Sequence, residues 1–207
     1  MEFVKASDLP FNPREQIAKI FAEGFYEHGL SSFSKDKAKL AKAFAHSFVL
    51  NSFYVAVEGE EIMSLVGCTD KKPPPLQMDK KFLIKELGFI RGRIAYWGVN
   101  KFVVNKPYPF EMLPQEGSIE FVAAASEHKG KGATYGLLSY VMEASPFNSH
   151  VLEVIDHNEP AIKLYEKLGF REFKRVAGPR GSGIKEFVYM RKAKERAICH
   201  EYKYGNN

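Results

Sequence analysis

A basic, glycine-rich turn carries the strongest chemical signal in this sequence. Residues 129–132 read Lys-Gly-Lys-Gly and follow an almost uninterrupted apolar stretch at residues 119–125. That stretch predicts a strand buried on both faces, and from Ala133 the apolar residues recur at helical spacing. The first N–H groups of a helix lack partners within the helix, and with the helix dipole they favour anions. The turn therefore predicts an anion site, and phosphate is the usual ligand of such sites.

Two familiar phosphate-binding loops do not fit the sequence. The nearest approach to a P-loop, residues 178–185, has Ile184 where the motif needs lysine, and it is better explained as a hairpin connection between two late strands. A dinucleotide fingerprint would begin at Gly130, but the third glycine, Gly136, comes one position too late. Taken alone, residues 129–132 are better explained as a plain strand-to-helix turn.

A second segment, residues 152–176, strengthens the interpretation. A short strand at residues 152–155 precedes Asn158, which is a favourable N-cap, and Pro160 then falls in the first helical turn, where its missing N–H costs nothing. Apolar residues mark the helix up to Leu168. Gly169 follows at the position where helices commonly end, and Phe170 begins another strand.

Taken together, residues 118–143 and 152–176 resemble the GNAT superfamily of acetyl-CoA-dependent N-acetyltransferases. The resemblance implies an α/β fold with a central mixed, largely antiparallel sheet of about six or seven strands and helices on both faces. It also implies transfer of an acetyl group from acetyl-CoA to a primary amine by direct attack in a ternary complex. Acetyl-CoA is then a co-substrate, and no metal is expected.

The family's pyrophosphate-binding turn reads (Gln/Arg)-x-x-Gly-x-(Gly/Ala), and it falls on residues 129–134. Two positions depart from the pattern, because Lys129 replaces glutamine or arginine and Thr134 replaces glycine or alanine. Lysine keeps the charge but loses the planar fork of arginine. The resemblance implies that the backbone N–H groups of this turn cradle the CoA pyrophosphate. The residues implied are Lys129, Gly130, Lys131, Gly132, Ala133 and Thr134.

The resemblance also implies cofactor contacts from the preceding strand and the following helix. In the family the pantetheine arm pairs with the backbone of this strand, which here ends in Ala123, Ala124 and Ala125. Small side chains leave room for a thin ligand, although they would also suit a tight contact between sheet and helix. Asn158 is implied to contact the cofactor, which is compatible with its role as an N-cap.

Two residues are candidates for proton transfer. The resemblance gives Tyr165 the role of the general acid that protonates the departing thiolate, although a helical tyrosine on an apolar face also suits core packing. Glu120 interrupts an apolar strand, and it is the candidate base for the attacking amine. The alternative for Glu120 is an ion pair with a nearby lysine or exposure to solvent. His128 and His157 are interpreted as solvated loop residues.

The chain as a whole predicts a globular protein. Its 207 residues are 45% hydrophobic and 27% charged, with a net charge of +5. We expect a single N-acetyltransferase domain at residues 1–192 and a loosely held tail at residues 193–207. Cys68 and Cys199 lie far apart without metal-binding spacing, which suits a reducing environment. With no apolar leader and no long apolar run, the expected location is cytoplasmic.

The residues before the motifs predict one strand at residues 3–4, helices at residues 13–28 and 35–49, and a hairpin at residues 53–68. Ser34 or Ser32 is the candidate cap of the second helix. By analogy with the family, the connection between these helices, residues 28–33, would border the acceptor amine.

An insertion at about residues 70–117 separates the third and fourth predicted strands. It is too long for a structureless loop and predicts one or two helices. It is also basic, because nine basic residues oppose four acidic ones between residues 71 and 117. A lid over the acceptor cleft, a dimer surface and a helical hairpin that covers the sheet are all compatible with it.

Three classes of function remain at this point. The leading hypothesis is an N-acetyltransferase that acts on a small-molecule or peptide amine, with a homodimer also compatible. The second is a non-catalytic acyl-CoA-binding module. The third is a nucleic-acid binder, suggested by a pI of about 9.0, but no nucleic-acid motif supports it. No nucleic-acid or membrane partner is therefore expected.

Overall fold

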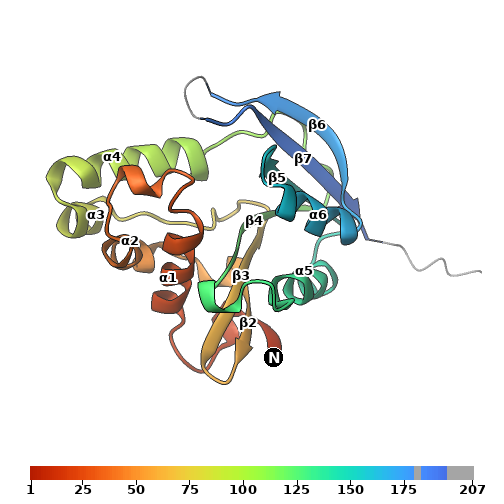
Figure 1. Cartoon of the computed structure of the whole chain (residues 1–207), viewed down its shortest axis with the longest axis horizontal. Helices are drawn as coiled ribbons and strands as arrows, with labels where there is room; N and C mark the ends of the chain where they lie inside the picture. The colour runs from red at the N-terminus through yellow and green to blue at the C-terminus, as the bar shows by residue number, and fades with distance from the viewer. Residues whose placement is uncertain (180–182, 195–207) are drawn as a thin grey trace, which may run out of the picture.

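The computed structural model describes residues 1–179 and 183–194, and a seven-stranded sheet lies at its centre (Figure 1). The strand order is β1-β2-β3-β4-β5-β7-β6, and β4–β5 is the parallel pair in a sheet otherwise paired antiparallel. The predicted mixed, largely antiparallel sheet is confirmed. The strands are β1 (Glu2–Lys5), β2 (Phe53–Glu58), β3 (Glu61–Thr69), β4 (Glu116–Ala124), β5 (Ser149–Ile155), β6 (Arg171–Ala177) and β7 (Glu186–Ala193).

Helices cover both faces of the sheet, as predicted (Figure 1). On one face α1 (Arg14–Gly24), α2 (Lys37–Phe44), α3 (Lys80–Leu87) and α4 (Phe89–Val99) share a core that includes Phe21. On the other face α5 (Ala133–Ala144) and α6 (Glu159–Lys167) share a core that includes Leu137. The shorter helical turns are Ala6–Asp8, Leu30–Ser32, Ala45–Ser47, Leu50–Ser52, Ser126–His128 and the π-helical turn Asn100–Val104.

The central strands appear in the sequence as continuous apolar runs because their side chains alternate between two buried faces of the sheet. In β2, Phe53 and Val55 belong to the core beneath α1, whereas Tyr54 and Ala56 belong to the core beneath α5. A strand buried on both faces has no solvent-facing positions, so the usual alternation of polar and apolar residues disappears.

The insertion forms a helical pair, α3 and α4, beside α2 (Figure 1). Asp79 caps α3, because its carboxylate accepts hydrogen bonds from the N–H groups of Lys81 (2.7 Å) and Phe82 (3.2 Å). Gly88, at φ +88°, makes the turn into α4. A Cβ on Gly92 would lie 2.5 Å from Cα of Ile84, so only glycine permits this approach of the two helices. The prediction of one or two helices in the insertion is confirmed.

A bulge in β4 separates it from β5. Phe121 has φ +52°, and the register between β3 and β4 shifts at this point. The parallel pairing of β4 with β5 ends at Ile119 and Leu152. Beyond that point, Glu120, Ala123 and Ala124 pair with β3 while residues 153–155 pair with β7. The two parallel strands therefore diverge from Glu120 onward.

A buried ion pair holds β4 and β5 together before they diverge. Arg191 of β7 donates to Glu116 through Nε (2.7 Å) and Nη2 (3.1 Å), and the Glu116 side chain is fully buried. The Ser149 hydroxyl of β5 donates to the same carboxylate at 3.0 Å. Because β4, β5 and β7 share these bonds, β4 and β5 are held together before they diverge.

Some details differ from the sequence-based expectations. The cap of α2 is Asp36, whose side chain accepts from the Lys39 N–H, and neither Ser32 nor Ser34 takes this role. Both α1 and α2 are shorter than predicted, because helical turns and loops take up their C-terminal parts. Cys199, most of the expected tail and residues 180–182 of the connection between β6 and β7 lie outside the described residues. Within the described residues, no helix is both long and apolar enough to cross a membrane.

Candidate active site

The glycine turn presents backbone N–H groups at the start of α5. Gly130 (φ +78°) and Gly132 (φ +82°) adopt left-handed conformations, which L side chains rarely adopt. Gly132 is the N-cap of α5, and it has no side chain to bond the N–H groups of the first helical turn. The first bond within this helix runs from the Gly136 N–H to the Gly132 carbonyl (3.0 Å). The N–H groups of Ala133, Thr134 and Tyr135 therefore face outward, as an anion site requires.

Charged side chains surround this turn. Lys129 and Lys131 are exposed, and the Lys131 ammonium lies 3.3 Å from Nδ1 of His128. Nε2 of His128 lies 2.8 Å from the Glu61 carboxylate, and the His128 side chain is only 11% exposed. The interpretation of His128 as a solvated residue is wrong, because β3 supplies a partner that covers it. The His157 side chain is 59% exposed, which agrees with its interpretation as a solvated loop residue.

The three alanines at the end of β4 lie where the strand has separated from β5. Ala123 and Ala125 are buried in the core beneath α1, and Ala124 is partly exposed. A Cβ on Gly24 of α1 would lie 3.0 Å from Cβ of Ala123, so small residues are needed on both sides of this contact. Close packing thus explains Ala123 without a ligand. The β4 edge that faces away from β3 has no paired strand at residues 120–124.

The helix α6 places Asn158 and Tyr165 as the sequence predicted. Oδ1 of Asn158 accepts the Ala161 N–H at 3.3 Å, which makes Asn158 the N-cap. Tyr165 is 6% exposed and packs edge-on against Phe170, with ring centres 6.0 Å apart. Burial raises the pKa of the Tyr165 hydroxyl well above its usual value. The phenol is therefore protonated at neutral pH.

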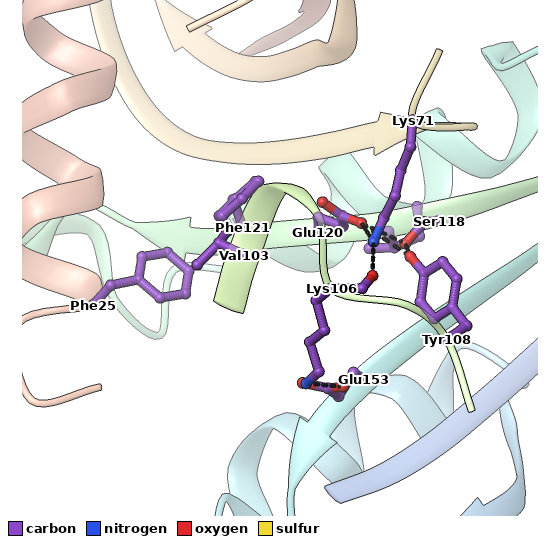
Figure 2. A pocket seen from close by; sticks show the side chains of 10 residues that line it. Phe25, Lys71, Val103, Lys106, Tyr108, Ser118, Glu120, Phe121 and Glu153 are labelled. Atoms are coloured by element: carbon purple, nitrogen blue, oxygen red, sulfur yellow. Dashed lines mark hydrogen bonds and ion pairs between the residues drawn. The ribbon is translucent and has the colours of Figure 1, made fainter. Parts of the chain in front are cut away.

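Glu120 lines a cavity of about 240 Å³ on the opposite face of the sheet from Tyr165 (Figure 2). Its Oε1 accepts from the Tyr108 hydroxyl (3.0 Å) and the Ser118 hydroxyl (3.0 Å), and it lies 3.4 Å from the Lys71 ammonium. The Glu120 side chain is 16% exposed. Glu120 therefore forms the ion pair with a lysine that was the alternative to its role as a base. Its side chain also lines the cavity.

A second carboxylate lines the same cavity (Figure 2). Both oxygens of Glu153 lie 2.6 Å from the Lys106 ammonium, and the Tyr189 hydroxyl donates to Oε2 at 2.5 Å. Each of the two cavity carboxylates is therefore paired with one lysine. Burial and the nearby Glu120 charge raise the pKa of the Tyr108 hydroxyl, so Tyr108 is a hydrogen-bond donor at neutral pH.

A model of the acetyltransferase (GNAT) family matches residues 14–170, which include the turn, Asn158, Tyr165 and Glu120. The chain belongs to the GNAT family. An N-alpha-acetyltransferase of Saccharolobus solfataricus is 32% identical over 109 residues, which are 51% of this chain and 62% of the relative. The alignment thus spans less than two thirds of that relative's length.

Solved structures share the GNAT fold. The N-acetyltransferase from Staphylococcus aureus Mu50 has a TM-score of 0.62 at 18% identity, covering 93% of this chain and 100% of that one. The ribosomal-protein-S18-alanine N-acetyltransferase from Escherichia coli has a TM-score of 0.54 at 14% identity, covering 97% and 98%. These likenesses confirm the GNAT architecture expected from the sequence.

In this GNAT chain the predicted residues fall into two groups. The turn at residues 129–134, Asn158 and Tyr165 belong to elements on the α5–α6 side of the sheet. Glu120 lies in the cavity on the other side, and Tyr165 is not among the residues that line that cavity. The divergence of β4 and β5 begins at Glu120, between the two groups.

The sequence analysis missed Ser118, Tyr108 and Glu153 as site residues and counted Lys106 only as a charge. Ser118 lies two residues before Glu120 on the same strand face, and Glu153 interrupts β5 as Glu120 interrupts β4. The rule that selected Glu120 would have selected Glu153 as well. Tyr108 and Lys106 lie in a proline-rich segment without periodicity, and no local signal could have placed them here.

The remaining reactive groups do not extend the site. Burial raises the pKa of the Cys68 thiol to about 12, so Cys68 supplies no thiolate at neutral pH. Among the described residues, His, Cys, Asp and Glu side chains form no cluster of three or more that could hold a metal ion.

Proposed function

We propose that this GNAT protein transfers the acetyl group of acetyl-CoA to a primary amine by direct attack in a ternary complex. The observation that carries the proposal is the divergence of β4 and β5 at Glu120. This divergence lies between the glycine turn at the start of α5 on one face and a carboxylate-lined cavity on the other. Two substrates that enter from opposite faces would meet at this gap.

The turn and the free edge of β4 would bind the cofactor. The N–H groups of residues 129–134 suit a pyrophosphate, because they lie at or just before a helix N-terminus with no capping side chain. The exception is the Lys131 N–H, which donates to the His128 carbonyl at 3.3 Å, so Lys131 would act through its ammonium group. The edge of β4 that faces away from β3, at Ala123 and Ala124, would hydrogen-bond the pantetheine arm as a neighbouring strand would. Ala125 would contact the arm without a backbone hydrogen bond, because its N–H donates to the Met63 carbonyl (2.9 Å) and its carbonyl accepts from the His128 N–H (2.9 Å). Asn158, at the start of α6, would contact the same arm from the β5 side.

Two proton transfers complete the reaction. Acetyl-CoA supplies a thioester, and a new N–C bond forms as the C–S bond breaks. Glu120 accepts a proton from the amine, directly or through one water, so that the nitrogen lone pair is free. Tyr165 donates its proton to the departing thiolate sulfur. Most of the rate enhancement would come from holding the reactants in position.

The acceptor belongs to the broad class of primary amines. The S. solfataricus relative is called an N-alpha-acetyltransferase. The E. coli protein is named as an N-acetyltransferase of an alanine of ribosomal protein S18. For this chain both a peptide amine and a small-molecule amine fit the proposal.

Replacing Glu120 with glutamine tests the proposed base. Glutamine keeps an oxygen that can accept from Tyr108 and Ser118, but it takes up no proton. We expect kcat/KM for amine-dependent CoA release to fall about 100-fold at neutral pH. The deficit should shrink once the pH exceeds the pKa of the amine, because the free base then needs no help.

The control for this test is Glu111→Gln, which removes an exposed carboxylate in the insertion outside the cavity. The assay is thiol release with the fastest amine of a panel, measured from neutral to alkaline pH. A Glu120→Gln profile that parallels the wild-type profile at every pH would remove Glu120 as the base.

A further inference from the structure

A second cavity, of about 410 Å³, adjoins the Glu120 cavity. The two share Phe25, Val103 and Phe121 as lining residues, so they lie side by side. The second volume falls within the range of small-molecule binding sites. A ligand whose amine lies at Glu120 could therefore extend into it.

The walls of the second cavity are aromatic and aliphatic. One wall comes from α1 and the segment that follows it, and the other comes from the insertion. His28 and Ser32 are its polar side chains, and the Ser32 hydroxyl already donates to the Gly29 carbonyl at 2.6 Å. None of the described residues that line it carries a carboxylate. The lining residues are Phe21, Phe25, His28, Gly29, Leu30, Ser32, Phe33, Ile94, Trp97, Gly98, Val99, Val103 and Phe121.

The insertion side of this cavity leaves apolar surface in contact with water. Trp97 is 56% exposed and Ile94 is 53% exposed, although both are large apolar side chains. Clustered apolar surface that lines a hollow is typical of a ligand site. Covering it with an apolar group would remove this surface from water.

Charge in the adjoining cavity selects against polycations. Glu120 is paired with Lys71 at 3.4 Å and Glu153 with Lys106 at 2.6 Å. A second or third ammonium group would therefore meet carboxylates that are already neutralised, or an apolar wall. Burying a charge against apolar surface is costly.

We propose that the acceptor is a primary amine that carries a large apolar, preferably aromatic, group a few bonds from its nitrogen. The amine occupies the Glu120 cavity, and the apolar group fills the cavity between α1 and the insertion. This inference rests on the proposed function and narrows its substrate class. Both 2-phenylethylamine and a peptide that begins with phenylalanine have this chemistry.

Trp97 is the single tryptophan of the chain, so its fluorescence reports directly on this cavity. The whole protein is titrated with 2-phenylethylamine and Phe-Gly-Gly, and with propylamine, Ala-Gly-Gly and spermidine as comparisons. Excitation at the red edge of tryptophan absorption avoids the phenyl ring. We expect each aromatic ligand to give a saturable change and to bind at least about tenfold tighter than its short counterpart, because a phenyl group is buried.

Gly98→Leu provides the matched variant and keeps the Trp97 reporter. A Cβ at Gly98 would lie 3.5 Å from the Phe33 ring, an ordinary contact, so the leucine would fill the cavity without a clash at Cβ. It should weaken binding of the aromatic ligands at least about tenfold. Phe89→Leu is the control, because Phe89 lies on the same helix, is 67% exposed and does not line the cavity.

The outcomes separate this inference from the proposed function. Preference for both aromatic ligands supports the shared chemistry, and preference for one of them identifies a peptide or a small molecule as the source. Aromatic ligands that bind no tighter than propylamine, tighter binding of spermidine, or unchanged affinity in Gly98→Leu would overturn the inference. Because the titration needs no turnover, an inactive protein still gives a result. Acetyl transfer without aromatic preference would leave the proposed function standing.

Discussion

Replacing Gly132 with aspartate is expected to abolish acetyl-CoA binding while the protein stays folded. The new carboxylate would stand at the N-terminus of α5, where the pyrophosphate is proposed to bind. Two unit charges about 4 Å apart repel by about 4 kcal/mol at an effective dielectric constant of about 20, so affinity should fall at least about 100-fold. A Cβ at Gly132 meets nothing within 4 Å, and the fold loses only the energy needed to hold φ at +82°.

The measurement is the rise in melting temperature that acetyl-CoA produces, with ATP as a polyanion control. The wild type should show a rise that is selective for acetyl-CoA, and Gly132→Asp should show none. Gly132→Ala carries the same backbone strain without the charge, so it should retain part of the rise. Gly59→Asp, at φ +61° in the β2–β3 turn, measures the strain at a position outside residues 129–134. A normal rise in a folded Gly132→Asp protein would mean that the pyrophosphate binds elsewhere.

Replacing Tyr165 with phenylalanine is expected to lower kcat by about 100-fold or more and to leave the affinity for acetyl-CoA nearly unchanged. The phenyl ring keeps its contact with Phe170. Stability should therefore change little. Without the phenol, the thiolate must leave unprotonated or take its proton from water.

The split between kcat and affinity is the decisive readout for Tyr165. CoA release gives kcat, and calorimetry gives the dissociation constant of acetyl-CoA. Tyr140→Phe, on the neighbouring helix α5, is the control, because Tyr140 packs against Phe3 and Tyr54 away from the proposed site. Equal kcat in Tyr165→Phe and the wild type would show that another group protonates the sulfur.

Local rules predicted the parts of the site that are built from consecutive residues. Gly169 follows α6 with φ +90°, the left-handed conformation typical of a glycine at the helix end predicted there. Asn158 caps α6, and the insertion forms helices. Each of these features depends on neighbours within a few positions, so the sequence carries the information directly.

The surroundings of Glu120 depend on residues that are distant in the sequence. Lys71 lies 49 positions before Glu120, and Tyr108 comes from a segment with neither helical nor strand periodicity. The partner of His128 is Glu61, on a strand that precedes the insertion. Such pairs are fixed by the sheet order and by the path of the insertion, which no local pattern specifies.

Acetyl transfer by the wild-type protein tests the central claim most directly. The protein is incubated with acetyl-CoA and a panel of primary amines, and both free CoA thiol and the acetylated amine are quantified by mass spectrometry. The account predicts amine-dependent CoA release with one acetylated amine formed for each thiol released. Binding of acetyl-CoA without amine-dependent release across the panel would contradict it, and would favour a non-catalytic acyl-CoA-binding module.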